Sequence, residues 1–243
     1  MEWHILATRP AMRKHLDRAG PHPHMQGIEL NSFATWPGRG LYALTDGPRE
    51  DLLEVVSRAL GGGARLLQYR DPTMDAARRH AEATALRQLC HERGVPLIID
   101  DDIALAKAVG ADGVHLGNVE KDIGTARSEL GSHAIIGAAC CNSLQLARAA
   151  ARAGASYLSF GAFFPSPTKP LAPRASIDLL RQSAALGLPR VAIGGITPDN
   201  GSPLIDAGAD FLAAVSAVFG ASDVHTAAQR FAGMFSPDRE STR

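Results

Sequence analysis

Short apolar runs that alternate with amphipathic stretches dominate the chain from Leu41 onward. Each run is brief and nearly continuous in apolar content, which is typical of strands buried on both faces of a parallel sheet. The stretches between the runs have helical periodicity, as in residues 75–93 and 143–154. The eight runs are LYALT (41–45), RLLQYR (65–70), LIID (97–100), GVHLG (113–117), AIIGAA (134–139), YLSFGAFF (157–164), RVAIGG (190–195) and FLAAVS (211–216).

Eight strand–helix units predict an α/β fold, a (β/α)8 TIM barrel in a single domain. Glycine-containing triplets, GGA, GAD, GAS and GAD, precede four of the runs. A glycine there can take the left-handed conformation that ends a helix before the next strand begins. The alternative is an open, doubly wound sheet of similar composition. The count of eight, with no long insertion between the runs, favours the barrel.

The two ends of the chain differ from the barrel region. We expect an irregular N-terminal extension over residues 1–38 with one short helix near 9–18, the barrel over 39–236, and a C-terminal tail over 237–243. The four histidines of the extension have spacings that match no metal-ligand pattern; they are His4, His15, His22 and His24.

Composition excludes several classes of protein. Lys plus Arg and Asp plus Glu both number 25, so the formal net charge is zero, and a broad basic face for nucleic acid is not expected. No apolar run is long enough to span a bilayer. The three cysteines, Cys90, Cys140 and Cys141, form no disulfide framework or CxxC pair, which fits a reducing, cytoplasmic setting. A homo-oligomer is left open.

Carboxylates follow neighbouring strands at the edge where active sites of such barrels lie. Asp100 ends the third run, Asp101 and Asp102 follow it directly, and Glu120 follows the fourth run. Carboxylates gathered at one mouth favour a cation between them, and hard oxygen ligands suit Mg²⁺. We therefore predict Asp101 and Glu120 as metal ligands and Asp102 as the cap of the next helix.

A second cluster predicts a phosphate site at the ends of the last three strands. Gly195 lets the backbone approach an anion closely, and Val215 and Ser216 offer amides at the start of the last unit. The segment PSPTKP after the sixth run adds hydroxyls and a cation from Ser166, Thr168 and Lys169; its alternative interpretation is a proline-stiffened loop or a polyproline ligand.

Together these segments resemble the thiamine phosphate synthase family. The resemblance rests on GLYALTD, LLQYRD, a carboxylate run before GADGVHLG, FGAFFPSPTKP, VAIGGITPDN and GADFLAAVSAVF, in that order. It implies the joining of hydroxymethylpyrimidine diphosphate to thiazole phosphate, with Mg²⁺, to give thiamine monophosphate and diphosphate. The implied substitution is dissociative: the diphosphate leaves first, and the thiazole nitrogen then attacks.

The resemblance also implies residue roles. Gln68 and Arg70 would contact the pyrimidine diphosphate, with Asp100 beside them. Lys169 would reach the diphosphate, so Arg70 and Lys169 would be the catalytic cations. The residues implied to hold the thiazole phosphate are Ser166, Thr168, Gly195, Val215 and Ser216.

Four positions depart from the family pattern, all on the diphosphate side. Pro72 replaces a lysine, Asp100 an asparagine, Glu120 an aspartate and Ala139 a serine. Two alternatives therefore stay open: a non-catalytic thiazole-phosphate binder, and a thiazole tautomerase. The tautomerase activity resembles one that depends on a histidine shortly after the fifth strand. This chain has Cys141 at that position. His115, within the fourth run, is expected to be a barrel-layer residue rather than a catalyst.

Overall fold

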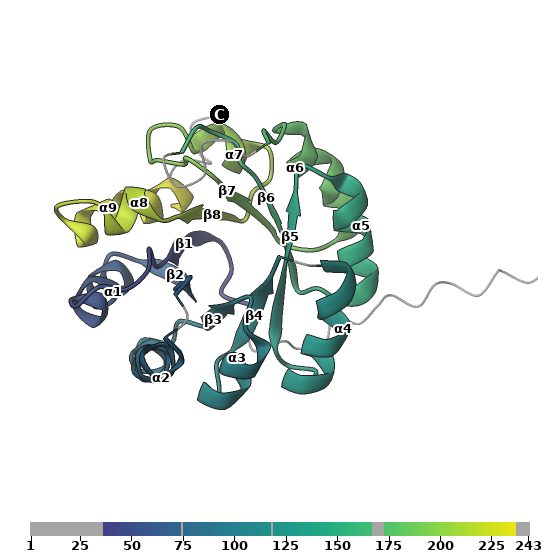
Figure 1. The fold of residues 1–243 in the computed structure, drawn as a ribbon. Helices are drawn as coiled ribbons and strands as arrows, with labels where there is room; N and C mark the ends of the chain where they lie inside the picture. Colours follow the sequence, from purple (N-terminus) through teal and green to yellow (C-terminus); the bar gives the residue numbers. More distant parts are fainter. Residues whose placement is uncertain (1–35, 74, 118, 167–172, 237–243) are drawn as a thin grey trace, which may run out of the picture. The chain divides into compact units, whose positions relative to one another are not determined.

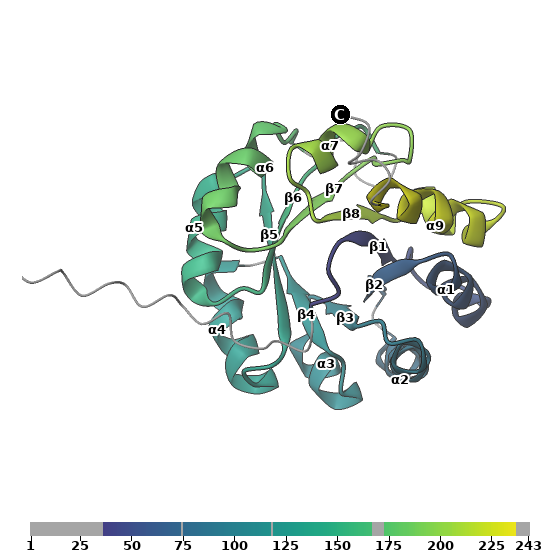
Figure 2. The same cartoon turned by 180° about the vertical axis from the view of Figure 1, so that it is seen from behind.

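The computed structural model describes residues 36–73, 75–117, 119–166 and 173–236, with only the backbone described for 119–121. Eight parallel strands form one closed barrel, in which each strand pairs with the next along the chain and β8 pairs with β1. Helices surround the barrel (Figures 1 and 2). The (β/α)8 prediction is confirmed, and the open doubly wound sheet is wrong. The described elements are β1 (Gly40–Leu44), α1 (Leu52–Gly61), β2 (Ala64–Tyr69), α2 (Ala76–Glu92), β3 (Leu97–Asp100), α3 (Ile103–Val109), β4 (Gly113–Leu116), α4 (Val119–Leu130), β5 (Ile135–Cys141), α5 (Leu144–Ala153), β6 (Tyr157–Phe160), α6 (Asp178–Gln182), η1 (Ser183–Leu186), β7 (Arg190–Ile193), α7 (Ser202–Asp206), β8 (Phe211–Ala214), α8 (Ser216–Phe219), α9 (Val224–Ala232) and η2 (Gly233–Phe235).

Two apolar clusters share the strands by alternation. Successive side chains of a strand point to opposite faces, so one set packs outward against the helices and the other fills the barrel. The inner cluster is Tyr42, Leu44, Leu66, Ile98, Ile135, Tyr157, Val191, Phe211 and Ala213. Trp36, just before β1, packs its ring against Tyr157 and Phe211 at centroid distances of 5.4 and 5.3 Å. The barrel interior is therefore a packed core beneath its mouth.

Helix ends follow the signals in the sequence. The side chains of Asp75, Asp102 and Ser143 accept hydrogen bonds from backbone N–H groups three residues on, at the starts of α2, α3 and α5. Gly110 and Gly154 end α3 and α5 in the left-handed conformation, with φ of 64° and 93°. Both kinds of cap satisfy backbone groups that a helix end leaves without partners.

The sixth apolar run is only partly a strand. β6 ends at Phe160, and the chain then bends over the end of β7. The N–H of Phe163 donates to Ile193 O at 3.2 Å, and that of Phe164 donates to Gly194 O at 2.9 Å. The apolar residues 161–164 thus line a loop that packs across the barrel edge.

Several predictions fall outside the described residues. They include the extension up to residue 35 with its short helix and four histidines, and the tail over 237–243. The expected domain boundaries stay predictions. Within the described residues, no helix is both long enough and apolar enough to cross a membrane.

Candidate active site

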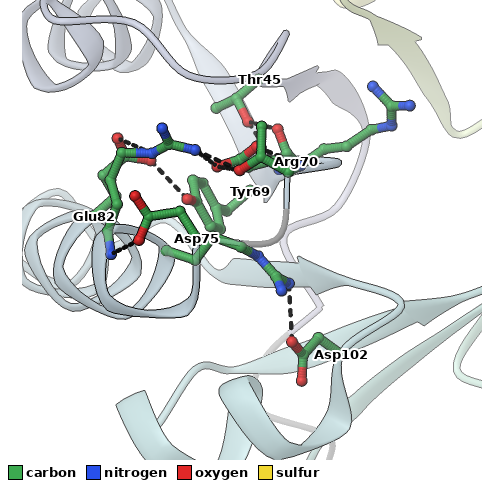
Figure 3. A network of polar contacts seen from close by, with 10 residues as sticks. Thr45, Tyr69, Arg70, Asp75, Glu82 and Asp102 are labelled. Carbon is green, nitrogen blue, oxygen red and sulfur yellow. Dashed lines mark hydrogen bonds and ion pairs between the residues drawn. The ribbon is translucent and has the colours of Figure 1, made fainter.

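Gln68 lies near the carboxyl end of β2, and Arg70 is the first residue of the loop that follows β2. Gln68 is buried, and its Nε2 donates to Tyr42 Oη at 3.0 Å. The Arg70 backbone is held by one side chain: its N–H donates to Thr45 Oγ1 at 2.8 Å, and Thr45 Oγ1 donates to Arg70 O at 2.9 Å. The buried Thr45 therefore fixes where Arg70 leaves the strand (Figure 3).

Arg70 pairs with the last residue of the neighbouring strand. Its Nε lies 3.5 Å from Asp100 Oδ2, and each side chain is about a quarter exposed. Parallel pairing of β2 with β3 brings the two strand ends to one edge, which is why residues thirty apart in sequence meet. The structure therefore brings together two of the residues predicted for the diphosphate side.

Asp101 has an unusual backbone at the mouth of the barrel. Its φ is 52°, a left-handed conformation that aspartate tolerates better than most residues. The N–H of Asp101 donates to His115 O at 2.8 Å, and its Oδ1 accepts from Gly117 N at 2.6 Å. These bonds hold the exposed carboxylate against the end of β4, with Oδ2 as the atom that a cation could take.

Asp102 takes no part in this cluster. Its Oδ1 caps α3 by accepting from Leu105 N, and its Oδ2 pairs with Arg79 at 2.8 Å. The prediction of a cap is confirmed. Among the described residues no group of three or more His, Cys, Asp or Glu side chains could hold a metal ion. A Mg²⁺ held by one or two carboxylates and by substrate phosphates needs no such group.

The loop after β2 is locked by a buried carboxylate. The Asp71 side chain is fully buried and lies 2.6 Å from Arg78 Nη2 on α2. Its carboxylate also accepts from the N–H and hydroxyl of Thr73. Burial alone would raise the pKa of Asp71, but the bonds from Thr73 and Arg78 hold it below its usual range. The loop that follows Arg70 is therefore anchored to α2.

A second contact joins the same strand and helix. Tyr69 Oη donates to Glu82 Oε2 at 2.6 Å, and Figure 3 includes both side chains. Burial, and then the bond to Glu82, raise the pKa of Tyr69 above its usual value.

The glycines after β7 are explained by close packing of two loops. Gly194 and Gly195 have φ of 103° and 65°. A Cβ on Gly195 would lie 2.2 Å from Pro165 O, and one on Gly194 would lie 2.5 Å from Ala162 Cβ. These glycines let the loop after β6 lie directly on the end of β7. Their packing role stands beside the predicted anion contact, which stays a prediction for Gly195.

Val215 and Ser216 follow β8, next to this loop pair. Ile193 pairs with Ala213 in the sheet, so Gly195 and Val215 continue neighbouring strands two residues farther on. Ser216 is the exposed first residue of α8, which has only four residues. A helix this short carries little dipole, so an anion here would depend on backbone amides from more than one loop.

A chain of polar side chains inside the barrel was not predicted. Tyr42, Tyr157 and His115 are linked by hydrogen bonds beneath the mouth. Thr45 also escaped prediction. The available signal was position: each of these residues lies within or at the end of an apolar run, where a polar side chain needs a partner.

The comparison with protein families decides where the chain belongs. A family model described as thiamine monophosphate synthase matches residues 41–218. The chain belongs to this family. Every predicted site residue, from Gln68 to Ser216, lies inside the matched range, which runs from β1 into α8.

Relatives of known name agree with the family. The chain is 54% identical to a thiamine-phosphate synthase from Thiobacillus denitrificans over 85% of this chain and 99% of the relative. It is 49% identical to one from Chromobacterium violaceum over 81% and 96%. A solved thiamine phosphate pyrophosphorylase from Pyrococcus furiosus is 35% identical, with a TM-score of 0.72 over 80% of this chain and 94% of that one.

Part of the predicted synthase site lies outside the described residues. Thr168 and Lys169 fall within 167–172, and the Glu120 side chain belongs to the segment described only as backbone. Ser166, the last residue before that gap, is half-buried at the end of the loop that lies on β7. Of the predicted metal ligands, the structure therefore places Asp101 alone.

Proposed function

We propose that this chain condenses hydroxymethylpyrimidine diphosphate with thiazole phosphate, forming thiamine monophosphate and releasing diphosphate. The chain is a thiamine-phosphate synthase, and so a transferase, by its family. The observation that carries the proposed roles is the meeting of Arg70 with Asp100 at the ends of β2 and β3, beside Asp101, because this sets a cation and carboxylates where a diphosphate and its metal would bind.

Stabilising the departing diphosphate is the main catalytic task. When the C–O bond to the diphosphate breaks, negative charge grows on the leaving oxygen, and the aminopyrimidine delocalises the positive charge left on its methylene group. Arg70 and Lys169 are the cations we assign to the leaving group, since preplaced charges stabilise such a transition state without reorganisation. The thiazole nitrogen then attacks the methylene carbon, and no strong general base is needed.

Asp100 partly neutralises the positive charge of Arg70. While the ion pair persists, the guanidinium is partly neutralised, and a diphosphate must compete with the Asp100 carboxylate for it. A diphosphate carries more negative charge than a single carboxylate and can accept two parallel bonds from the guanidinium. We infer that Arg70 exchanges Asp100 for the diphosphate when the substrate binds.

The donor set fits Mg²⁺. Asp101 presents a carboxylate at the barrel mouth, and Glu120, in the first turn of α4, is the second ligand we assign. When bound, Mg²⁺ would supply positive charge for the diphosphate oxygens. The bond from Gly117 N–H holds Oδ1 of Asp101, and Oδ2 is the atom that we assign to the metal.

The thiazole phosphate is assigned to the opposite side of the mouth. Ser166 and Thr168 offer hydroxyls, and Gly195, Val215 and Ser216 offer backbone amides. Holding both substrates in one mouth raises their effective concentration toward each other, which is a large part of the rate gain in such substitutions. Ala139 stands where the family pattern has a serine. It pairs in register with Ser159 on β6, so a serine hydroxyl is present on the neighbouring strand.

Isotope-traced synthesis from the two purified substrates, with and without Mg²⁺, tests the proposal. We expect labelled thiamine monophosphate and an equal amount of diphosphate, only with the metal. A non-catalytic binder would bind thiazole phosphate and form no product, and a tautomerase would change the thiazole without consuming the pyrimidine. Either result would overturn the proposal. The reducing, cytoplasmic setting is part of the same proposal and agrees with three free thiols, two of them buried.

A further inference from the structure

A row of four residues crosses the barrel wall from the last residue of β3 to the first residue of β6. In the register of the sheet, Asp100 pairs with His115, His115 with Gly137, and Gly137 with Tyr157. A Cβ on Gly137 would lie 2.1 Å from Tyr157 Cζ and 2.5 Å from His115 Nδ1. The glycine thus leaves space for a histidine and a tyrosine from β4 and β6 to meet across β5.

Hydrogen bonds continue this contact to Gln68. Tyr157 Oη lies 2.9 Å from His115 Nδ1 and 2.9 Å from Tyr42 Oη, and Gln68 Nε2 donates to Tyr42 Oη at 3.0 Å. At the other end, His115 Nε2 lies 3.4 Å from Ser159 Oγ. The rings of His115 and Tyr157 are also stacked, with 13° between their planes. Five side chains from β1, β2, β4 and β6 therefore form one chain, in which His115 is half-buried and the other four are buried.

The chain has a direction because each phenol has a single proton. Burial raises the pKa of Tyr42 and of Tyr157 far above their usual values, and the charge of Asp100 adds to both shifts, so both phenols stay protonated. Gln68 donates to Tyr42, and Tyr157 Oη is the acceptor that lies beside the buried Tyr42 hydroxyl, so donation from Tyr42 to Tyr157 leaves no buried hydroxyl proton without an acceptor. Tyr157 in turn donates to His115 Nδ1.

The same rule sets the histidine and the amide at the two ends. A His115 that accepts at Nδ1 has its proton on Nε2, which faces Ser159. At the other end, an amide whose Nε2 faces Tyr42 leaves its Oε1 as the acceptor. If all the bonds ran in the opposite direction, Tyr42 would donate to Gln68 Oε1. The Nε2 group would then face the ligand and offer it only N–H donors.

We propose that the chain from Ser159 through His115, Tyr157 and Tyr42 holds the Gln68 amide with Oε1 available to the substrate, and so selects an aminopyrimidine over an oxopyrimidine. The inference rests on the proposed function, in which Gln68 contacts the pyrimidine. An exocyclic amino group donates to Oε1, whereas a ring carbonyl at the same place would set two acceptors against each other. Tyr42, Tyr157 and His115 are positioning residues that act through Gln68.

The first test compares two substrates in Tyr157→Phe. The wild type should use the 4-amino pyrimidine diphosphate with a much higher kcat/KM than the 4-oxo analogue. Removing the Tyr157 hydroxyl frees Tyr42 to donate to Gln68, so the amide can turn, and the preference should fall about tenfold. A purely structural role would lower the active fraction for both substrates and leave their ratio unchanged.

Tyr69→Phe is the matched control, because Tyr69 is also buried and hydrogen-bonded but contacts Glu82 on α2. Its ratio of the two kcat/KM values should equal that of the wild type. An unchanged ratio in Tyr157→Phe would overturn the inference while leaving the proposed function intact. A wild type that makes no thiamine monophosphate would overturn the proposed function, and the inference with it.

A second measurement needs no variant. The ¹⁵N shifts of the His115 ring, assigned through the backbone, report which nitrogen has the proton. We expect protonated Nε2 and unprotonated Nδ1 in the full-length wild-type chain. Protonated Nδ1 would mean that the bonds run in reverse, and it would overturn the inference even if Tyr157→Phe did not fold.

Discussion

The Arg70 guanidinium lies 3.5 Å from the Asp100 carboxylate, so the cation assigned to the diphosphate already has a partner in the protein. The pair is part-exposed on both sides, which limits its own worth to about 1 kcal/mol. The ion pair matters more for ligand binding than for stability, because it determines how much of the Arg70 charge is available to the diphosphate.

Asp100→Asn should therefore tighten binding of the pyrimidine diphosphate. Removing the competing carboxylate frees Arg70, and we expect the Kd to fall about three- to tenfold in the presence of Mg²⁺. Calorimetric titration measures it. Asp102→Asn is the control, since it removes the adjacent charge, asparagine still caps a helix, and Arg70 keeps its partner. Weaker binding in Asp100→Asn would show that Asp100 supports the site through the metal or the placement of Arg70.

Ser216→Ala and Lys169→Ala should differ in which kinetic constant they change. Ser216 is assigned to a phosphate that does not react, so its loss should raise the KM for thiazole phosphate and leave kcat within about twofold. Lys169 is assigned to charge that grows on the leaving diphosphate, so its loss should lower kcat as well as kcat/KM. Steady-state kinetics with each substrate varied in turn separates the two. Equal effects on kcat would contradict the assignment.

Residues of the N-terminal extension should be dispensable for chemistry. The ring contacts of Trp36 define how far the chain can be shortened without loss of stability. A chain that begins at Thr35 keeps Trp36 against Tyr157 and Phe211, and its kcat should stay within about twofold of the full chain. A chain that begins at Pro37 loses this ring, and its free energy of unfolding should fall by about 1–3 kcal/mol. Urea unfolding and the synthesis assay on both chains check this. A loss of more than about tenfold in kcat for the Thr35 chain would place the extension in the site.

Asp71 should make stability fall in acid. Its pKa is lower in the folded chain than in the unfolded one, so its contribution is present above the unfolded value of about 3.9 and is lost as the pH falls through the folded pKa. Asp71→Asn should lower the free energy of unfolding by about 1–3 kcal/mol at pH 7 and flatten its dependence below about pH 4. Urea unfolding at pH 7 and pH 3 measures both effects.

Asp178→Asn is the control for this effect, because Asp178 pairs with Arg181 on the exposed face of α6. It should change stability little at either pH. A wild-type slope below pH 4 that persists in Asp71→Asn would assign the acid sensitivity to other carboxyls.

The barrel was predictable because its signal is repeated. Each strand carries its own apolar run, and closure follows from eight of them. The cap at Asp102 was predictable for a similar reason, since local hydrogen bonding decides it. Thr45 was not, because its role depends on the pairing of β1 with β2, which brings its hydroxyl to the backbone of Arg70.

Other parts of the site depend on contacts that no local pattern contains. Gly194 and Gly195 suggested an anion site, yet the loop after β6 already uses the space that their missing side chains leave. The partnership of His115 with Tyr157 requires Gly137 on the strand between them. Strand register decides such contacts, and register is set by the closed barrel as a whole.

In this assignment, the cluster at the ends of β2 and β3 drives the departure of the diphosphate. Single-turnover synthesis with saturating substrates and Mg²⁺, by wild type and by Arg70→Ala, tests it most directly. We predict one diphosphate released for each thiamine monophosphate formed by the wild type, and a rate about 100-fold lower in Arg70→Ala at the same ratio. An unchanged rate in Arg70→Ala, with substrate binding intact, would contradict the account.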